Sequence, residues 1–268
     1  MLITSLSNPK IKDVYALKDK KRRLSARMFI AEGVNLIKDI PANVEILTYV
    51  VGENFAKADF KFRAGAEILT VGERVFKKLS DVDTPQEILA VIKMTDSQRV
   101  LTDSGILVLD GIRDPGNLGT LFRSAAAFGF LNVVLIDCAD AYAPKTVRAS
   151  MGGIFSLNLR EQNRTDALND VDRGEYTLIG LDMKGESILK YTQNESIPRC
   201  DKIGNTTQNP KKYAVIVGGE ASGISAELLR RCDKTLSIDM QNAVESLNAS
   251  VAGSIAMYIL SRNADRRL

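Results

Sequence analysis

The sequence contains no histidine, only three cysteines and no long apolar run. The absence of histidine excludes every mechanism that needs an imidazole base or ligand, including Ser-His-Asp triads and zinc sites built on histidine. Cys138, Cys200 and Cys232 are far apart and odd in number, so they indicate neither a C-x-x-C pair nor a disulfide framework, which suits a reducing compartment. Because no apolar stretch approaches the ~18 residues that cross a bilayer, and residues 1–11 lack the apolar core of a signal peptide, we expect a cytoplasmic protein with no membrane partner.

What is present is ordinary in amount but uneven in position. The 268 residues are 45% hydrophobic and 26% charged, values typical of a globular chain with one large domain or two medium ones. Residues 1–30 hold eight Lys or Arg against two Asp, a net charge of +6, and the remaining residues carry a net charge of −3. This asymmetry indicates a nucleic acid or another anionic surface as partner.

Alternating helical and strand-like patterns predict an α/β fold with two domains. A helical stretch from Asn8-Pro9 to about Ala26 is followed by strands and helices of a small α/β domain, expected over residues 1–95. The predicted strands of this domain cover residues 28–31, 46–51, 67–70 and 88–92, and its other helices cover residues 35–39 and 72–79. Residues 96–104 are expected to be a linker.

A second alternating series predicts a mostly parallel sheet in a domain over residues 105–268. The predicted strands cover residues 106–109, 132–136, 177–181, 214–217 and 235–238, and the predicted helices cover residues 118–128 and 247–262. The polar segment 185–212 is expected to be a mobile surface insertion.

Three strand-to-helix loops of the second domain carry the residues that suggest chemistry. The first, from Asp110 to Arg123, is rich in glycine, follows an apolar strand and opens a helix, a geometry that suits anions. The second is the segment Val215–Ile224, with three glycines and Glu220. The third leads into the last helix through Ser246-Leu247-Asn248. Open α/β sheets place their ligands at the carboxyl ends of strands, where all three loops lie.

Two interpretations of single features compete with this one. Asn117 and Ser246 are common helix-capping residue types, and Glu220 could likewise only cap the helix that follows it. Gly218, Gly219 and Gly223, with Asp239 about 20 residues later, imitate a dinucleotide-binding fingerprint and suggest a nicotinamide-dependent oxidoreductase. That match is imperfect, because the order is G-G-x-x-x-G and little chain follows it.

Taken together, the three segments resemble the SpoU (TrmH-like) family of RNA 2′-O-ribose methyltransferases, in the SPOUT superfamily. Its first motif is similar to Asn117, Arg123 and the small-residue helix ending at Phe128-Gly129. Its second, Gly-x-Glu-x-x-Gly, is similar to Gly218–Gly223. Its third is similar to Ile238-Asp239-Met240 with Ser246-Leu247-Asn248, although Asp239 replaces the usual Pro. The opening of the chain resembles the L30e-like substrate-binding domain of the family, except that Glu87 stands where Gly is usual.

The resemblance implies a C-terminal trefoil knot that binds S-adenosylmethionine, a homodimer, and no metal, since the sulfonium group carries the reactive charge. It implies that the cofactor contacts Gly218, Ile238 and Leu247, with Leu181, Gly219 and Met240 as lesser candidates. It implies catalytic roles for Arg123, Asn117, Glu220, Ser246 and Asn248. We expect Arg123 to clamp the target phosphate, since arginine stays protonated. A carboxylate, an arginine or a substrate phosphate remains possible as proton acceptor.

The expected substrate is structured RNA, most favourably ribosomal RNA of the 23S type, because a separate basic domain precedes the catalytic one. The same chemistry on tRNA is the alternative. A binding-only RNA chaperone is disfavoured because every polar motif residue is present. The expected contacts to RNA phosphates come from the basic side chains near the N-terminal helix, namely Lys10, Lys12, Lys20, Lys21, Arg22 and Arg23.

Overall fold

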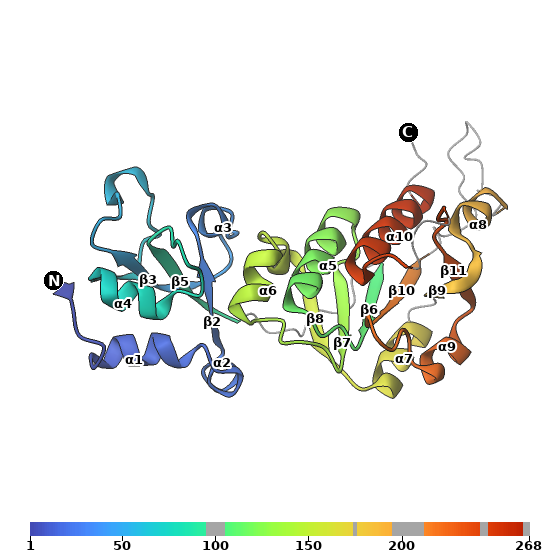
Figure 1. The fold of residues 1–268 in the computed structure, drawn as a ribbon, viewed down its shortest axis with the longest axis horizontal. Coiled ribbons are helices and arrows are strands. Elements are labelled where there is room, and N and C mark those ends of the chain that lie inside the picture. Colours follow the sequence, from blue (N-terminus) through green and yellow to red (C-terminus); the bar gives the residue numbers. More distant parts are fainter. Residues whose placement is uncertain (95–104, 174–175, 195–211, 242–245, 265–268) are drawn as a thin grey trace. The chain divides into compact units, whose positions relative to one another are not determined.

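The computed structural model describes residues 1–94, 105–173, 176–194, 212–241 and 246–264 (Figure 1). Its internal contacts define two compact units, Met1–Asp96 with Asp140–Phe155, and Ser97–Ala139 with Ser156–Leu268. Residues 140–155, which the sequence placed in the second domain, therefore pack with the first unit. The expected linker, residues 96–104, lies outside the described residues.

The first unit is built on a five-stranded mixed sheet in the order β1-β4-β3-β5-β2. Strands β1, β4 and β3 run parallel, and β5 is antiparallel to both β3 and β2. The strands are β1 (Leu2–Ile3), β2 (Met28–Glu32), β3 (Ile46–Gly52), β4 (Glu67–Val71) and β5 (Ile88–Lys93). The helices are α1 (Pro9–Ala16), α2 (Lys20–Ala26), α3 (Val34–Lys38), η1 (Lys57–Asp59), α4 (Glu73–Leu79), α6 (Pro144–Ala149) and η2 (Gly153–Ser156).

Helices α1 and α4 cover one face of this sheet with a continuous apolar core. Ile11 and Val14 of α1 and Phe76 of α4 are buried against Val50 and Leu89 of the strands. Burying apolar area of this kind stabilises the unit by about 25 cal/mol per Å². The position of each helix is thus set by its apolar stripe, as the sequence pattern predicted.

The predicted single helix from Pro9 to Ala26 is wrong, because α1 and α2 are separate helices. Asn8 caps α1, and the chain leaves the helix after Ala16. Asp19 then caps α2, its carboxylate accepting a hydrogen bond from the backbone N–H of Arg22 at 3.0 Å. An aspartate satisfies the free N–H groups of a new helix start better than it supports a helix interior. Leu24 of α2 is 45% exposed, so it does not extend the apolar face of α1.

The second unit is built on a six-stranded, fully parallel sheet in the order β11-β9-β10-β6-β7-β8. The strands are β6 (Ile106–Asp110), β7 (Asn132–Ile136), β8 (Asn158–Glu161), β9 (Thr177–Ser187), β10 (Tyr213–Gly218) and β11 (Lys234–Ser237). The helices are α5 (Pro115–Phe128), α7 (Arg164–Arg173), α8 (Ile188–Asn194), α9 (Ala226–Arg231) and α10 (Ala249–Ala264). This confirms the mostly parallel sheet that the sequence predicted.

Helices cover both faces of this sheet (Figure 1). Residues of α7 and α9, such as Leu168 and Leu228, join the strands in one core cluster. Helices α5 and α10 pack side by side on the other face, where a side chain at Gly253 would collide with Leu121. The close α5–α10 contact carries the first and third motifs toward each other.

The predicted insertion over residues 185–212 is wrong for its first part. Strand β9 continues to Ser187 and helix α8 follows directly, with Ile188 and Tyr191 buried. The apolar residues in this otherwise polar segment are spaced for a helix that packs on its neighbours. Residues 195–211 lie outside the described residues.

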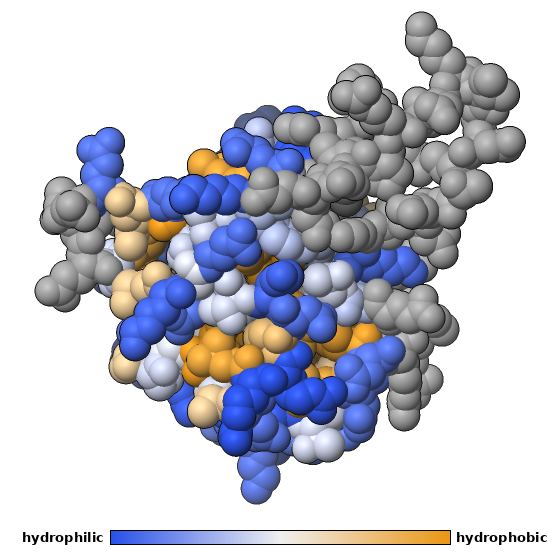
Figure 2. All heavy atoms as spheres, turned by 90° about the vertical axis from the view of Figure 1, so that its right-hand side faces the viewer, coloured by the Kyte–Doolittle hydropathy of each residue, from blue (hydrophilic) through white to orange (hydrophobic). Residues whose placement is uncertain are grey.

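None of the described helices combines the length and the apolar character needed to cross a membrane. The end-on view of the second unit shows apolar patches separated by hydrophilic side chains (Figure 2). The large apolar residues exposed on this unit include Met183, Leu189, Val251 and Tyr258.

Candidate active site

The candidate site lies where β6 and β10 end side by side. Asp110 and Gly218, the last residues of the two strands, are paired in the sheet. Helix α5 begins just after β6, and its N-cap is Asp114, whose carboxylate accepts from the backbone N–H of Asn117 at 2.8 Å. The capping role that Asn117 could have had is therefore filled by Asp114. The side chain of Asn117 remains available for the site.

A chain of hydrogen bonds joins the three motifs through Asn117. Its side-chain N–H donates to the carboxylate of Glu220, on the loop after β10. Its side-chain carbonyl accepts from the amide of Asn248 at 3.1 Å and from the hydroxyl of Ser250 at 3.3 Å. An amide side chain has both donors and acceptors, so it can connect a carboxylate to a second amide. The first motif thus meets the second and the third, which lie 103 and 131 residues further along the chain, at one point.

Ser250 is a site residue that the sequence analysis missed. It is buried, and its hydroxyl also donates to the side-chain carbonyl of Asn248 at 2.6 Å. The same carbonyl accepts the backbone N–H of Ser250 at 2.9 Å, so Asn248 caps α10 while its amide faces Asn117. A sequence signal existed, since Ser250 follows Asn248 by two residues at the start of an apolar helix.

Arg123 and Ser246, two of the predicted catalytic residues, do not join this chain. Arg123 is exposed on α5 and makes no hydrogen bond or ion pair with any described residue. Ser246 is exposed just before α10. Within the chain, the Glu220 carboxylate contacts Asn117 and not Arg123.

The loop after β10 is closed by contacts between glycine backbones. A side chain on Gly218 would lie 2.1 Å from the carbonyl carbon of Gly223, and one on Gly219 would lie 2.4 Å from the carbonyl oxygen of Gly111. Such separations are far below any contact that real side chains make. The backbone N–H of Gly219 donates to the carbonyl of Asp110 at 2.8 Å, and that of Gly223 donates to the carbonyl of Gly219 at 2.9 Å. Both glycines are thus required by the loop itself.

The apolar side chains predicted to contact the cofactor lie within β9, just after β11 and just before α10. Gly180 of β9 pairs with Ile216 of β10 on one side and with Thr235 of β11 on the other. Residues 181–185 then leave the β11 ladder before pairing resumes at Glu186. The apolar side chains here are half-buried, and each keeps exposed surface: Leu181, Ile238, Met240 and Leu247.

Asp239, which the dinucleotide interpretation would place on a ribose, forms a hydrogen bond within the protein. Its carboxylate accepts a hydrogen bond from the hydroxyl of Ser187 at 2.6 Å. A ribose-binding acid in a dinucleotide fold accepts from the ligand instead.

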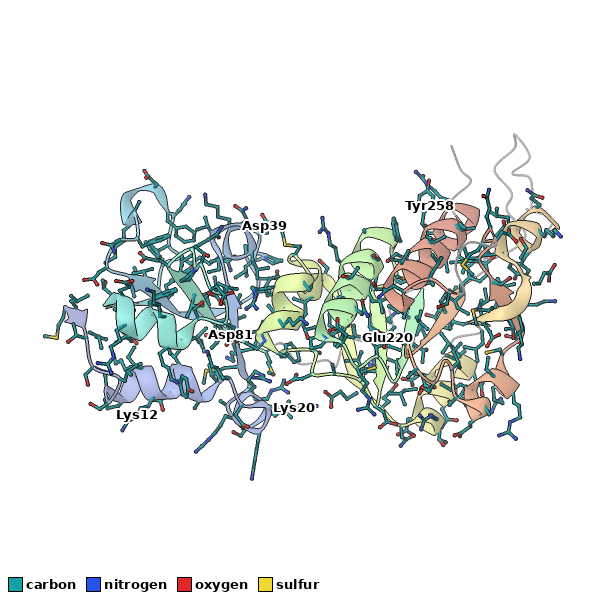
Figure 3. All side chains as sticks on the ribbon, viewed as in Figure 1. Lys12, Lys20, Asp39, Asp81, Glu220 and Tyr258 are labelled. Atoms are coloured by element: carbon teal, nitrogen blue, oxygen red, sulfur yellow. The ribbon has the colours of Figure 1, made fainter. Side chains whose placement is uncertain are left out.

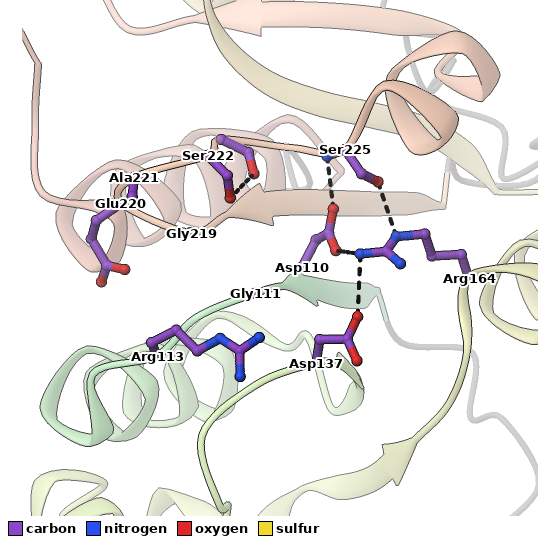
Figure 4. Close-up of a pocket in the computed structure, with 11 residues that line it drawn as sticks. Asp110, Gly111, Arg113, Asp137, Arg164, Gly219, Glu220, Ala221, Ser222 and Ser225 are labelled. Atoms are coloured by element: carbon purple, nitrogen blue, oxygen red, sulfur yellow. Dashed lines mark hydrogen bonds and ion pairs between the residues drawn. The ribbon is translucent and has the colours of Figure 1, made fainter.

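A cavity of about 480 Å³ lies on the β7 side of the loop after β10 (Figure 4). Buried Asp110 forms its floor, where Arg164 donates to the carboxylate at 3.0 Å and the backbone N–H of Ser225 donates at 2.8 Å. Partial burial, the largest single influence, would lower the pKa of the Arg164 guanidinium, but the charge and hydrogen bond of Asp110 and the charges of Asp137 and Glu227 together outweigh it, and the pKa is raised. Arg164 belongs to none of the three motifs, and nothing in the sequence pattern predicts this cavity.

The basic residues predicted to bind RNA are mostly exposed. Lys12, Lys20, Lys21 and Arg22 are exposed, and Figure 3 shows Lys12 and Lys20 on the outer side of α1 and α2. Lys10 is exposed but forms an ion pair with Glu67.

The prediction that Arg23 contacts RNA is wrong. Arg23 is 3% exposed, forms an ion pair with Asp140 and donates to the carbonyl of Leu17 at 2.6 Å. On a helix of 3.6 residues per turn, a run of four basic residues must turn one of them toward the core. Arg23 is that residue, and it ties α2 to the segment 140–155.

The fold and the site define an enzyme domain of the α/β class that binds its ligands at the carboxyl ends of a parallel sheet. The chain belongs to the SpoU rRNA methylase family, whose model matches residues 104–258. A second model, the MRM3-like substrate binding domain, matches residues 8–90. The resemblance that the motifs indicated is therefore confirmed, and the chain is an RNA methyltransferase.

Relatives and solved structures cover nearly the whole chain. The 23S rRNA (guanosine(2553)-2′-O)-methyltransferase RlmP of Bacillus subtilis is 30% identical over 96% of this chain and 98% of its own length. Human mitochondrial rRNA methyltransferase 3 is 30% identical over 72% of this chain and 57% of its own length. An S-adenosylmethionine-bound rRNA methyltransferase from Sinorhizobium meliloti is 27% identical, with a TM-score of 0.78 over 98% of this chain and 97% of its own.

Proposed function

We propose that the protein transfers a methyl group from S-adenosylmethionine to a ribose 2′-hydroxyl of ribosomal RNA. The observation that carries the proposal is the hydrogen-bonded chain from Glu220 through Asn117 to Asn248, because it assembles residues of all three family motifs at one place. Family membership supports the reaction class, and the name of the Bacillus relative supports ribosomal RNA of the 23S type as the substrate. We also propose that the protein is located in the cytoplasm.

The residues present fit the cofactor. Leu181, Ile238 and Leu247 are partly buried and keep some apolar surface uncovered, and a flat adenine ring would cover it. Gly218, Gly219 and Met240 complete the proposed contacts. S-adenosylmethionine supplies an electrophilic methyl group on a positively charged sulfur.

The polar residues would orient the hydroxyl that is methylated. Asn117 holds the Glu220 carboxylate in place, so the remaining oxygen of Glu220 can accept from the ribose hydroxyl or take up its proton. Asn248 and Ser250 fix the orientation of Asn117 in turn, and Ser246 lies at the entrance to the same helix. Groups fixed in this way cost no reorganisation during the reaction.

Arg123 would hold a phosphate next to the target ribose. A guanidinium matches a phosphate with two parallel hydrogen bonds, and the free side chain of Arg123 is available for that role. We propose that it acts across a homodimer, on the site of the partner. Exposed Tyr258 and Val251 on α10 and the Phe128–Tyr258 ring contact beside α5 support an apolar dimer interface on this face. We also propose that the second unit contains a C-terminal trefoil knot and that the first unit is an L30e-like domain.

The first unit would capture the RNA through its phosphates. Exposed Lys12, Lys20, Lys21 and Arg22 are suited to this, and Lys10 could exchange its surface partner Glu67 for a phosphate at little cost. The match of residues 8–90 to a substrate-binding domain supports this assignment.

Transfer of labelled methyl groups to defined RNA tests the function. Purified protein, tritiated S-adenosylmethionine and total rRNA from cells without the gene should yield one 2′-O-methylated nucleoside, and the same rRNA from cells with the gene should yield none. Purified tRNA serves as the second substrate, and calorimetry with NAD as the second cofactor. Methylation of a base, preference for tRNA, or binding of NAD in place of S-adenosylmethionine would each overturn the corresponding part of the proposal.

A further inference from the structure

The cavity beside the loop 219–225 contains polar groups that the proposed reaction does not use. It is lined by the ends of β6 and β7 on one side and by the loop 219–223 on the other (Figure 4). Arg113 and Asp137 face this loop across the opening, and Asp110 and Arg164 form the floor. Glu220 belongs to both the cavity wall and the hydrogen-bonded chain of the candidate site.

The floor of the cavity is held in one arrangement. Besides donating to Asp110, Arg164 donates to the hydroxyl of Ser225 at 3.1 Å and lies 3.3 Å from the carboxylate of Asp137. The backbone N–H of Ser225 donates to the other carboxylate oxygen of Asp110. Groups locked by several partners present a fixed polar surface to a ligand.

Two charged side chains at the rim of the cavity, Arg113 and Asp137, are exposed to a ligand. Arg113 is exposed and makes no hydrogen bond or ion pair with any described residue. The side chain of Asp137 is 61% exposed, and only one of its carboxylate oxygens lies near Arg164. Asp137 also has a φ of +50°, which turns the chain sharply just after β7 and brings its side chain to the cavity.

We propose that this cavity binds one unpaired nucleotide of the RNA substrate, with Arg113 on its phosphate and Asp137 on the amino group of its base. The volume falls in the range that encloses a small ligand, and the cation and acid lie on the same rim. A carboxylate accepts hydrogen bonds and donates none, so it favours bases with an exocyclic amino group over uracil. Because Glu220 is part of the loop that lines the cavity, a nucleotide bound in the cavity would lie close to the ribose that is methylated. The inference rests on the proposed function.

Five variants test the proposal, namely the four described next and Arg113→Lys. Arg113→Ala and Asp137→Asn each remove one proposed contact, while Arg231→Ala and Asp172→Asn disrupt an exposed ion pair between α9 and α7 that lies outside the cavity. Steady-state methyl transfer to rRNA and calorimetry with S-adenosylmethionine are measured for each. Binding of cytidine and uridine 5′-monophosphate to the wild-type protein is followed by NMR.

The expected result is a KM for rRNA about ten-fold higher in Arg113→Ala, equivalent to ~1.4 kcal/mol, with the affinity for S-adenosylmethionine and kcat within two-fold. Arg113→Lys should recover part of the loss, since it keeps the charge but not the planar fork. Asp137→Asn should reduce the preference for cytidine over uridine monophosphate. The control variants should match the wild type.

Two outcomes would overturn the proposal. An unchanged KM in Arg113→Ala and Asp137→Asn would show that RNA does not enter the cavity. A loss of affinity for S-adenosylmethionine in these variants would assign the cavity to the cofactor. If the wild-type protein methylates no RNA, the proposed function fails, while the nucleotide monophosphates still report directly on the cavity.

Discussion

Replacing Arg23 with Met should destabilise the first unit far more than replacing any exposed basic residue beside it. Arg23 is 3% exposed, and the side chain of its partner Asp140 is 14% exposed. A methionine fills a similar volume but leaves the Asp140 carboxylate buried without its cation. It also removes the donor to the carbonyl of Leu17.

The structure sets the size of the effect. Removing one partner of a buried ion pair costs ~3–5 kcal/mol, because the remaining charge stays desolvated. Asp140 keeps one bond, since it accepts the backbone N–H of Tyr142 at 2.9 Å. Asp140→Asn keeps an acceptor for that N–H and removes the charge. The double variant Arg23→Met with Asp140→Asn should therefore recover most of the loss and stay within ~1–2 kcal/mol of the wild type.

Urea unfolding followed by circular dichroism measures the change in the free energy of unfolding. Hydrogen exchange of residues 17–28 shows whether the loss is centred on α2. Arg22→Met is the matched control, because Arg22 precedes Arg23 on the same helix but is exposed, and surface changes stay within ~0.5 kcal/mol. If Arg23→Met costs no more than Arg22→Met, or if the double variant is as unstable as the single one, the buried pair does not have the role assigned to it.

Four further outcomes are expected. Arg123→Ala should abolish methyl transfer with cofactor affinity within a few-fold, and near-full turnover would contradict the phosphate clamp. Gly219→Ala should destabilise the second unit more than Gly111→Ala in thermal unfolding, because the new methyl group would lie 2.4 Å from the carbonyl oxygen of Gly111. Gly111→Ala introduces a side chain at a φ of +77°, but that side chain meets no atom within 4 Å. Burial raises the pKa of the Cys232 thiol to about 11. The neutral buried thiol therefore contributes stability that is fully present below pH 9 and is lost as the pH rises through 11, and Cys232→Ala should flatten this decline. Replacing Lys20–Arg22 with Ala should make the slope of log affinity for RNA against log salt shallower by up to roughly 2.7, at about 0.9 per phosphate contact, and an unchanged slope would place RNA binding elsewhere.

The apolar strands of both units could be predicted because burial on both faces requires continuous apolar residues. The strand at 132–136 has the predicted bounds, the strand at 106–109 is one residue longer at one end, and the strand at 214–217 is one residue longer at each end. Strand β8 was missed because three of its four residues, Asn158, Arg160 and Glu161, are polar, as suits the edge of a sheet. Helix α7 was missed for a related reason, since seven of its ten residues are polar and only Ala167, Leu168 and Val171 join the core.

The meeting of the three motifs could be predicted, but the partners within the site could not. A motif fixes residue types and their order, and parallel strands bring their carboxyl ends to one edge. Whether Asn117 contacts Glu220 or Arg123 depends on side-chain directions that only the packing of α10 on α5 determines. The burial of Arg23 likewise depends on Asp140, 117 residues away, which no local charge pattern indicates.

The glycine loop after β10 shows why a similar pattern serves a different chemistry from that of dinucleotide-binding folds. In those folds the glycines let the backbone approach a pyrophosphate, and the helix start faces the ligand. Here Gly218 lies against the backbone of Gly223, and Gly219 lies against that of Gly111, so the glycines close the loop on the protein. The N–H of Ser225, just before α9, is used by buried Asp110. A loop closed in this way cannot cradle a pyrophosphate, but it holds Glu220 rigidly at its tip beside Asn117. The order G-G-x-x-x-G is therefore the pattern of a loop that positions a carboxylate.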